Sequence, residues 1–271
     1  MKKPFETYNG GKGANGVHQQ IINHIPQCGL FIDAMVGNGS IFLNLSLPRL
    51  TIINDIDRNV IAKYDVSGSK TEILKYNTTY SWLIVQYDGM PGVFFYFDPP
   101  YHFDVRKSKQ ALYNTEWNHD EHVDFLEQCI MVKSNCMISH YPCELYDEML
   151  KGWYTHDFQA TTRNGVRTER IYMNYPPPVI LQDFRYLGKN YRERQRIKRK
   201  IERHLSKLES LPADERTAIL SSITVKYSAT AERFINSATP LTTILESTDF
   251  ARASSKKELL AIDTFLTDKT R

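Results

Sequence analysis

Three short, almost uninterrupted apolar runs constrain the fold of this chain more than any other feature of its sequence. They are residues 30–34 (LFIDA), 51–54 (TIIN) and 93–97 (VFFYF). A strand with one face in water alternates apolar and polar residues, whereas a strand covered by helices on both faces is apolar throughout. We therefore predict an α/β fold built on a largely parallel sheet.

Helical patterns lie between and after these runs. Residues 40–48 (SIFLNLSLP) predict a helix that begins just after a glycine pair, and residues 118–133 predict a second one. Asn118 and Glu121 have the spacing of a capping box for the second helix. Its predicted buried stripe consists of Val123, Leu126, Ile130 and Met131.

A strand near 136–139 should follow, and then a hairpin. Residues 156–163 and 166–175 flank Asn164-Gly165, the strongest short hairpin signal. An antiparallel hairpin is therefore predicted to end the sheet near Tyr175.

Three prolines at 176–178 mark a predicted domain boundary, with one domain at 1–178 and a basic helical region at 179–271. One helix is expected from about Lys189 and another at 214–223. The apolar face of the first consists of Ile197, Ile201, Leu205 and Leu208. Beyond Tyr227 the sequence is polar and weakly periodic.

The positive charge of the chain is confined to one segment. Between Lys189 and Lys207 there are nine Lys and Arg residues against Glu193 and Glu202, a local net charge of +7. Because the whole chain carries +3, the remainder carries −4. A partner with phosphate groups would meet the protein at this segment.

The composition excludes several classes. A hydrophobic content of 41% in 271 residues is typical of a folded protein, and no apolar run has the length of a membrane span or a signal core, so we expect a cytoplasmic protein without a membrane partner. The cysteines form no CxxC pair, so we expect packed or surface thiols and no metal site; they are Cys28, Cys129, Cys136 and Cys143.

A glycine pair follows the first predicted strand, in residues 34–40 (AMVGNGS). Gly37 and Gly39 permit a tight turn against a ligand, and Asp55, 18 residues after Gly37, is spaced to bind ribose hydroxyls. The third glycine of a dinucleotide fingerprint is absent and Ser40 is predicted to open a helix, which favours a mononucleoside-like ligand over NAD. A tight turn with a helix-capping aspartate is the alternative.

A second glycine-rich stretch, TYNGGKG at 7–13, resembles a phosphate loop only in part. Lys12 is followed by Gly13 instead of Ser or Thr, and no strand precedes the stretch. Taken alone, it indicates a flexible N-terminal turn.

The third predicted strand ends in Asp98, Pro99, Pro100 and Tyr101. A carboxylate in this position lies at the sheet edge where open α/β sheets bind ligands. The two prolines remove two N–H donors, so the Asp98 carboxylate and the Pro99 carbonyl remain as acceptors. Acceptors beside the Tyr101 ring suit an amino group on a planar ring, whereas a rigid turn alone would explain only the prolines.

Together these stretches resemble the Dam-like family of DNA adenine methyltransferases, in its compact, phage-type form. The resemblance is carried by TYNGGKG, FIDAMVGNGS (with Met35 where Phe is usual), NDID at 54–57, FYFDPPY and the segment from 138 to 178. It covers residues 4 to about 223 and implies a Rossmann-like class I methyltransferase fold, S-adenosylmethionine as the cofactor, double-stranded DNA as the partner and a bacterial cytoplasm, with a prophage or phage origin left open.

The resemblance also implies roles for residues. Asp98, Pro99, Pro100 and Tyr101 are the implied catalytic motif, which receives the 6-amino group of a flipped-out adenine. The implied cofactor-binding residues are Tyr8, Lys12, Asp33, Gly37, Gly39, Ser40, Asp55 and Asp98.

DNA contacts are expected in three places. Residues 102–117 and the hairpin lie near the catalytic motif in the expected fold, and the basic helix offers phosphate contacts; a solvated loop or helix face is the alternative in each case. The candidates are Arg106, Lys107, Lys109, Tyr113, Asn114, Arg163, Asn164, Arg167, Arg192, Arg196 and Arg199.

Two departures from the family pattern matter. Only about 40 residues separate Asp55 from Asp98, too few for the helical target-recognition domain of larger relatives, and TEILKYNTTYSWLI offers no clear acidic residue for the cofactor adenine. An RNA adenine methyltransferase, a cytosine 4-amino methyltransferase and an inactive DNA-binding protein of the same fold stay open as alternatives. So do a monomer and a DNA-bound dimer, the recognition sequence and the presence of a restriction enzyme.

Overall fold

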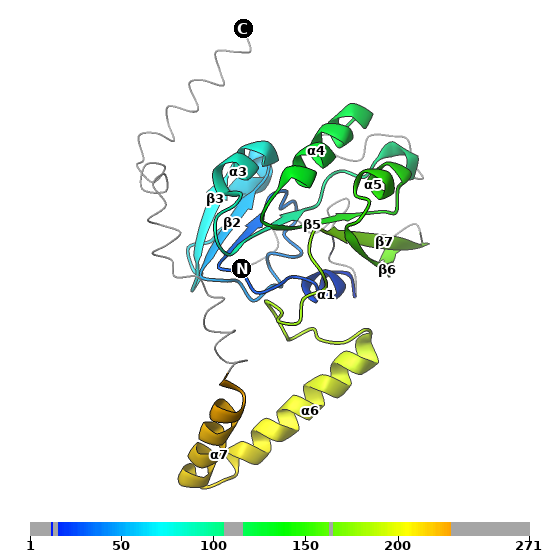
Figure 1. Cartoon of the computed structure of the whole chain (residues 1–271). Helices are drawn as coiled ribbons and strands as arrows, with labels where there is room; N and C mark the ends of the chain where they lie inside the picture. Colours follow the sequence, from blue (N-terminus) through cyan, green and yellow to red (C-terminus); the bar gives the residue numbers. More distant parts are fainter. Residues whose placement is uncertain (1–11, 13–15, 106–115, 163–164, 229–271) are drawn as a thin grey trace.

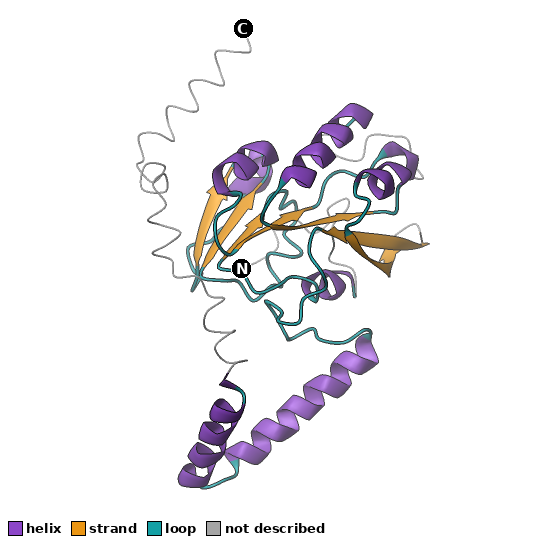
Figure 2. Ribbon diagram, viewed as in Figure 1, coloured by secondary structure: helices purple, strands orange, loops and turns teal. Residues whose placement is uncertain are grey.

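The computed structural model describes residues 12, 16–105, 116–162 and 165–228, and within them a twisted sheet carries helices on both faces (Figures 1 and 2). The strands are β1 Leu30–Asp33, β2 Leu50–Asn54, β3 Glu72–Tyr76, β4 Val93–Phe97, β5 Asn135–His140, β6 Tyr154–Thr162 and β7 Gly165–Met173. The helices are α1 Val17–Ile22, α2 Arg58–Ala62, α3 Tyr80–Tyr87, α4 His119–Met131, α5 Glu144–Met149, α6 Tyr191–Glu209 and α7 Ala213–Lys226, with a short 3₁₀ turn at Phe103–Val105.

The strand order is β3-β2-β1-β4-β5-β7-β6. The first five strands are parallel, and β7 is antiparallel to both β5 and β6. The order reverses between β1 and β4, and the crevice at such a reversal is where open α/β sheets bind ligands. The predicted α/β, Rossmann-like sheet with a terminal antiparallel hairpin is confirmed.

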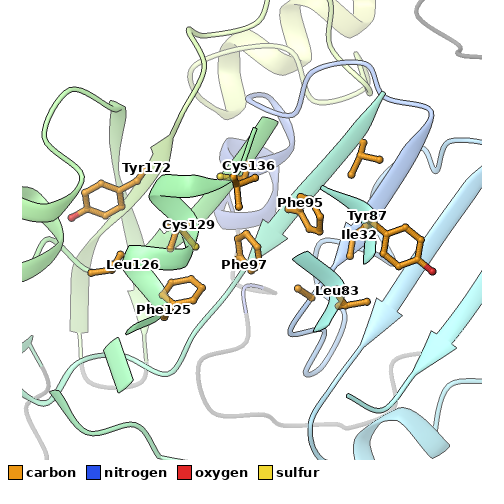
Figure 3. Close-up of a cluster of buried hydrophobic side chains, with 14 of the residues drawn as sticks. Ile32, Leu83, Tyr87, Phe95, Phe97, Phe125, Leu126, Cys129, Cys136 and Tyr172 are labelled. Atoms are coloured by element: carbon orange, nitrogen blue, oxygen red, sulfur yellow. The ribbon is translucent and has the colours of Figure 1, made fainter. Parts of the chain in front are cut away.

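The apolar runs pack as their composition predicts, because each contributes side chains to both faces of the sheet. Phe95 and Phe97 of β4 lie in one core with residues of α3 and α4 (Figure 3), while Phe94 and Tyr96 lie in the opposite core with residues of α1. Phe97 is fully buried and meets the ring of Phe125 edge-on, with 5.5 Å between centroids.

Residues 40–48 do not form the predicted helix; residues 40–44 form turns. Two helical hydrogen bonds occur, from Leu43 N to Gly39 O and from Leu45 N to Ile41 O. The Asn44 side chain donates to Ser40 O (2.8 Å), and the Asn44 carbonyl accepts bonds from the chain beyond β7. A regular helix would also give the Ser46 N–H to Phe42 O, but Ser46 N donates instead to the distant Asp183 carboxylate (2.8 Å), and Pro48 has no N–H to bond the Asn44 carbonyl.

Helix α4 begins where predicted, with Asn118 as its N-cap and Glu121 completing the capping box. The predicted stripe was right for Leu126, which is buried, and wrong for Ile130 and Met131, which are exposed. The buried side chains are His122, Phe125, Leu126 and Cys129. The true stripe begins with a histidine, which a search for apolar residues passes over.

Strand β5 and the hairpin are confirmed. Thr162 pairs with Gly165, so Gly165 begins β7, and the two residues that join the strands lie outside the described part of the chain. Strand β7, not β6, pairs with β5, which brings the second strand of the hairpin to Tyr101. All four cysteines are free and buried, so the expectation of packed thiols is confirmed.

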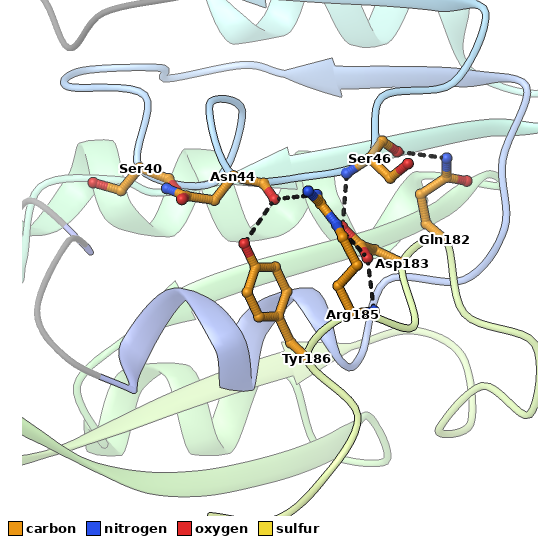
Figure 4. A network of polar contacts seen from close by, with 7 residues as sticks. All are labelled: Ser40, Asn44, Ser46, Gln182, Asp183, Arg185 and Tyr186. Atoms are coloured by element: carbon orange, nitrogen blue, oxygen red, sulfur yellow. Dashed lines mark hydrogen bonds and ion pairs between the residues drawn. The ribbon is translucent and has the colours of Figure 1, made fainter. Parts of the chain in front are cut away.

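A strap, residues 181–189, links the sheet to the C-terminal helices. Buried Asp183 accepts a bond from Ser46 N (2.8 Å) and pairs with Arg185, and Tyr186 donates to the Asn44 carbonyl (Figure 4). The strap therefore packs against residues 40–47, close to the glycine pair. The domain boundary at 178 stays a prediction.

Helices α6 and α7 extend away from the sheet and contain no buried residue (Figure 1). Both predicted helices are confirmed. The expected apolar face of α6 is uncovered, with Ile201 and Leu205 about half exposed. Among the described helices, none has the length and apolar character needed to cross a membrane.

Candidate active site

A pocket lies at the carboxyl ends of β1, β2 and β4, where the strand order reverses. It brings together residues from the first 100 positions and Trp117. Its lining comprises Lys12, Asp33, Ala34, Met35, Val36, Gly37, Asn38, Gly39, Ser40, Ile41, Asn54, Asp55, Ile56, Asp57, Thr78, Thr79, Tyr80, Tyr96, Asp98, Pro99, Pro100 and Trp117.

The glycine pair forms one wall in the predicted way. Gly37 and Gly39 both have positive φ, +48° and +65°, a conformation that glycine adopts at little cost. A Cβ on Gly39 would also lie 2.5 Å from the Tyr64 hydroxyl, which itself donates to Gly37 O. The turn therefore requires glycine at position 39 for space as well as for conformation.

Asp55 follows β2 directly, and each of its carboxylate oxygens accepts a hydrogen bond from a backbone N–H. Oδ2 accepts from Gly37 N (3.0 Å) and Oδ1 from Asp57 N (2.9 Å). Burial raises the pKa of Asp55, although these two bonds oppose the shift. The tight turn of the alternative is present, but the residue that caps helix α2 is Asp57 and not Asp55. Each oxygen of Asp55 also keeps a lone pair for a ligand hydroxyl.

Within the described part of the chain, two polar groups in the pocket have no hydrogen-bond partner: the Oδ1 atom of Asp33 and the hydroxyl of Ser40. Both side chains are buried, and both line the pocket. Burial raises the pKa of Asp33 well above its usual range, and the nearby Asp98 and Asp55 carboxylates add to the shift. Buried polar atoms normally have a partner, so these two point to a polar ligand.

We expect Asp33→Asn to stabilise the protein without ligand. The raised pKa means that the folded protein keeps a proton on Asp33 that the unfolded chain releases above the ordinary carboxyl pKa. Stability is therefore lost as pH rises through that window, and Asn removes this loss. Urea unfolding at about pH 5 and about pH 7 measures the effect. An unchanged pH dependence relative to wild type would refute the assignment, and exposed Asp124→Asn is the control.

The end of β3 supplies the pocket edge for which the sequence offered no acidic residue. Thr78, Thr79 and Tyr80 line the pocket there. Asn54 fixes this edge, since its side chain bonds Ala34 O, Thr78 O and Thr78 N. This edge of the pocket therefore presents hydroxyl and backbone groups.

Asp98 lies where β4 opens into the pocket, with its side chain 22% exposed. Its Oδ1 atom accepts from Ser139 Oγ at 3.0 Å and pairs with Lys12 Nζ at 2.9 Å. Ser139 is bonded in turn to the Tyr96 hydroxyl. Burial raises the pKa of Asp98, and the Lys12 charge opposes the shift.

Lys12 is buried in an ionic cluster with Asp98, Glu169 and Tyr101. Its ammonium group also pairs with Glu169 at 3.6 Å, bonds the Tyr101 hydroxyl and lies 4.5 Å from the centre of that ring. Burial lowers the pKa of Lys12, but the Asp98 and Glu169 carboxylates outweigh burial, and the net shift is upward. Lys12 therefore stays charged although it is buried.

Tyr101 is anchored at its hydroxyl and stacked on its ring. The hydroxyl donates to Glu169 Oε1 (2.7 Å), and the ring lies parallel to Tyr141, with 4.0 Å between centroids and 6° between planes. Lys12 lies at the hydroxyl end of the Tyr101 ring, and Tyr141 covers one face of it. A planar substrate can stack on that face only if Tyr141 moves.

The other candidates divide into two groups. Arg167 of β7 is close enough for its charge to act on Tyr141, and three basic residues of α6 are exposed, namely Arg192, Arg196 and Arg199. The rest lie outside the described residues: Tyr8, Arg106, Lys107, Lys109, Tyr113, Asn114, Arg163 and Asn164.

Glu169, Tyr141 and Ser139 belong to the site but were not predicted. Glu169 could have been found from the two-residue period of a strand. It lies on the same face of β7 as Ile171 and Met173, and both of those are buried. A carboxylate on the inward face of a strand signals a partner charge. Ser139 and Tyr141 had no comparable signal.

No protein-family model matches this sequence, and no curated protein matches it. Three solved structures illustrate the similarity that exists. Precorrin 8w decarboxylase of Methanobacterium thermoautotrophicum is 10% identical with a TM-score of 0.42, over 65% of this chain and 100% of that one. A SAM-dependent methyltransferase of Agrobacterium tumefaciens is 11% identical with a TM-score of 0.37, over 58% and 60%.

The third is the magnesium protoporphyrin IX methyltransferase of Synechocystis PCC 6803 with bound SAM, which is 13% identical with a TM-score of 0.35, over 58% and 80% of the two chains. These TM-scores are low and identify no activity for this chain. In the described residues, no group of three or more His, Cys, Asp or Glu side chains could hold a metal ion.

Proposed function

We propose that this chain is a site-specific DNA adenine methyltransferase that transfers a methyl group from S-adenosylmethionine to the 6-amino group of a flipped-out adenine. One observation supports this proposal more strongly than the others do. Asp98 lies where a ligand pocket with unpartnered polar groups meets a pair of aromatic rings, and a buried ammonium group already pairs with it.

The pocket residues fit S-adenosylmethionine. The Asp33 carboxylate suits the ammonium of the cofactor, Asp55 its ribose hydroxyls, and the unpartnered Ser40 hydroxyl a further polar group. When bound, the cofactor supplies an electrophilic methyl on its sulfonium. Asp33→Asn should then weaken cofactor binding while it stabilises the protein without ligand.

The cluster at Asp98 supports an amino group as the acceptor of the methyl. Lys12 shows that an N–H donor beside Tyr101 can reach Asp98, and both the Lys12 and Ser139 contacts end on Oδ1. We assign Oδ2 and the Pro99 carbonyl to the two protons of the substrate amine. These bonds would turn the nitrogen lone pair away from the ring and toward the methyl group.

The aromatic pair is the proposed place for the base itself. Tyr101 and Tyr141 stack directly on each other, so a flipped adenine would enter by separating them and would exchange a Tyr–Tyr contact for two base–aromatic contacts. Their stacking keeps both aromatic surfaces out of water until the base arrives. Flipping costs a few kcal/mol, which these contacts would offset.

The test is methyl transfer from labelled S-adenosylmethionine to duplex DNA and to structured RNA, followed by identification of the modified base. N6-methyladenine in the DNA alone supports the proposal. Label in the RNA alone would favour an RNA enzyme, N4-methylcytosine would move the substrate to cytosine, and cofactor binding without transfer would indicate an inactive member of the fold.

The basic helix α6 is the proposed phosphate-binding surface. Changing Arg192, Arg196 and Arg199 together to Gln should reduce the steepness of the salt dependence of DNA binding by up to about three, since each phosphate contact contributes about one. The measurement is log Kd against log salt concentration. A control variant with Lys70, Lys133 and Lys151 changed to Gln alters net charge equally, and the same slope for both variants would exclude this role for α6.

A further inference from the structure

His140, the last residue of β5, links the two loops that carry the aromatic pair. Its ring is fully buried. Nε2 lies 2.9 Å from the backbone N–H of His102, the residue after Tyr101, and Nδ1 lies 2.7 Å from the carbonyl of Tyr141. One side chain thus contacts the backbone at both members of the pair.

The partners define the protonation of the ring. A backbone N–H can only donate, so Nε2 of His140 must accept and carry no proton. A carbonyl can only accept, so Nδ1 must carry the hydrogen. Burial lowers the pKa of His140 well below its usual range, which keeps the ring neutral and preserves both bonds.

The orientation of the ring is held by its neighbours. Tyr146 of α5 stacks on it, with 4.0 Å between centroids and 8° between planes, and the Tyr146 hydroxyl is within 2.9 Å of His122 Nδ1. The Tyr101 ring meets His140 edge-on at 5.4 Å. Because the imidazole cannot turn without breaking this packing, its two hydrogen bonds have a defined geometry.

We propose that His140 is a positioning residue that sets the spacing and tilt of the Tyr101 and Tyr141 rings, and so prepares the place where the target base stacks. The expected effect of His140 on catalysis rests on the proposed function. Its expected effect on the geometry of the two rings does not, and that geometry can be measured separately.

Three substitutions separate the contributions of this side chain. His140→Phe keeps a ring against Tyr146 and removes both hydrogen bonds. His140→Gln can place its carbonyl oxygen where Nε2 lies and keep the acceptor for His102. His140→Asn can place its amide nitrogen where Nδ1 lies and keep the donor to Tyr141.

His140→Phe is expected to lower kcat by about 100-fold, the effect of a displacement of about 1 Å in a reacting group, with cofactor Kd changed less than about threefold. His140→Gln and His140→Asn should each recover part of the loss. A crystal structure of wild type should show the Tyr101 and Tyr141 rings parallel. A crystal structure of His140→Phe should show them displaced from this arrangement.

His24→Gln is the control, since the partly buried His24 ring follows α1, where it bonds Gln20 O at 2.7 Å and lies against His156. It should lower Tm with little change in kcat for the folded protein. Unmoved rings in His140→Phe, or equal kcat losses in His24→Gln, would overturn the inference. Absence of methyl transfer by wild type would refute the proposed function, and the crystal structures would still decide the role of His140.

Discussion

Asp98→Ala is expected to abolish methyl transfer, with a loss of kcat of at least about 1,000-fold. The substitution removes the acceptor for the substrate amine, and acceptors and donors aimed at a reacting group contribute about 100- to 1,000-fold each. Cofactor binding should persist, because the glycine turn, Asp33 and Asp55 form the greater part of the pocket. The measurement is single-turnover methyl transfer at saturating cofactor, with cofactor Kd measured alongside.

The pH dependence of wild type adds a second readout on the same residue. The raised pKa of Asp98 means that its proton is lost at a higher pH than from an ordinary carboxyl group. Because the protonated acid is the poorer acceptor, activity should fall as pH falls through that raised pKa. Residual activity of Asp98→Ala above about 10% of wild type would show that another group receives the amine.

Glu169→Ala is expected to lower kcat by about 100-fold. Glu169 accepts the Tyr101 hydroxyl bond and pairs with Lys12, so its loss frees the aromatic ring and leaves Asp98 as the carboxylate that pairs with the Lys12 ammonium. A shift of about 1 Å in Tyr101 would account for a loss of that size. Glu169→Gln can still accept the tyrosine bond and should fall between Ala and wild type.

Cofactor Kd distinguishes positioning from general damage in these variants. Glu169 does not line the ligand pocket, so Kd should change less than about threefold. Exposed Glu148→Ala is the control for removal of a carboxylate. If Tyr101→Phe retains full activity while Glu169→Ala does not, Glu169 acts through Lys12 and not through the tyrosine.

Much of the sheet was predictable because its strands are defined by local composition. The apolar runs at 30–34, 51–54 and 93–97 each need cover on both faces, and that need does not depend on where the rest of the chain lies. The capping box at Asn118 was predictable for the same reason, since cap and partner are three residues apart. The helix predicted at 40–48 does not form, because the Ser46 N–H that it would need is donated to Asp183 of the distant strap.

The site was predictable in part. Asp98, Asp55 and the glycine pair are recognisable because the chemistry of each is contained in a few adjacent residues. Glu169, Tyr141 and His140 were not recognised, because each is ordinary in its own stretch and acts through a contact with a distant one. The Tyr101–Glu169 bond, for example, joins residues 68 positions apart.

By itself, the sequence determined which segments must be buried strands and which short stretches carry acceptors, glycine turns and positive charge. These are local properties, decided by the polarity, backbone freedom and hydrogen-bonding groups of neighbouring residues. Only the tertiary structure decided that Lys12 is an ion-paired partner of Asp98, that β7 brings Glu169 to Tyr101, and that Tyr141 covers the ring on which a base would stack. The physical reason is strand order: β7 lies between β5 and β6, and that placement follows from the packing of the whole sheet.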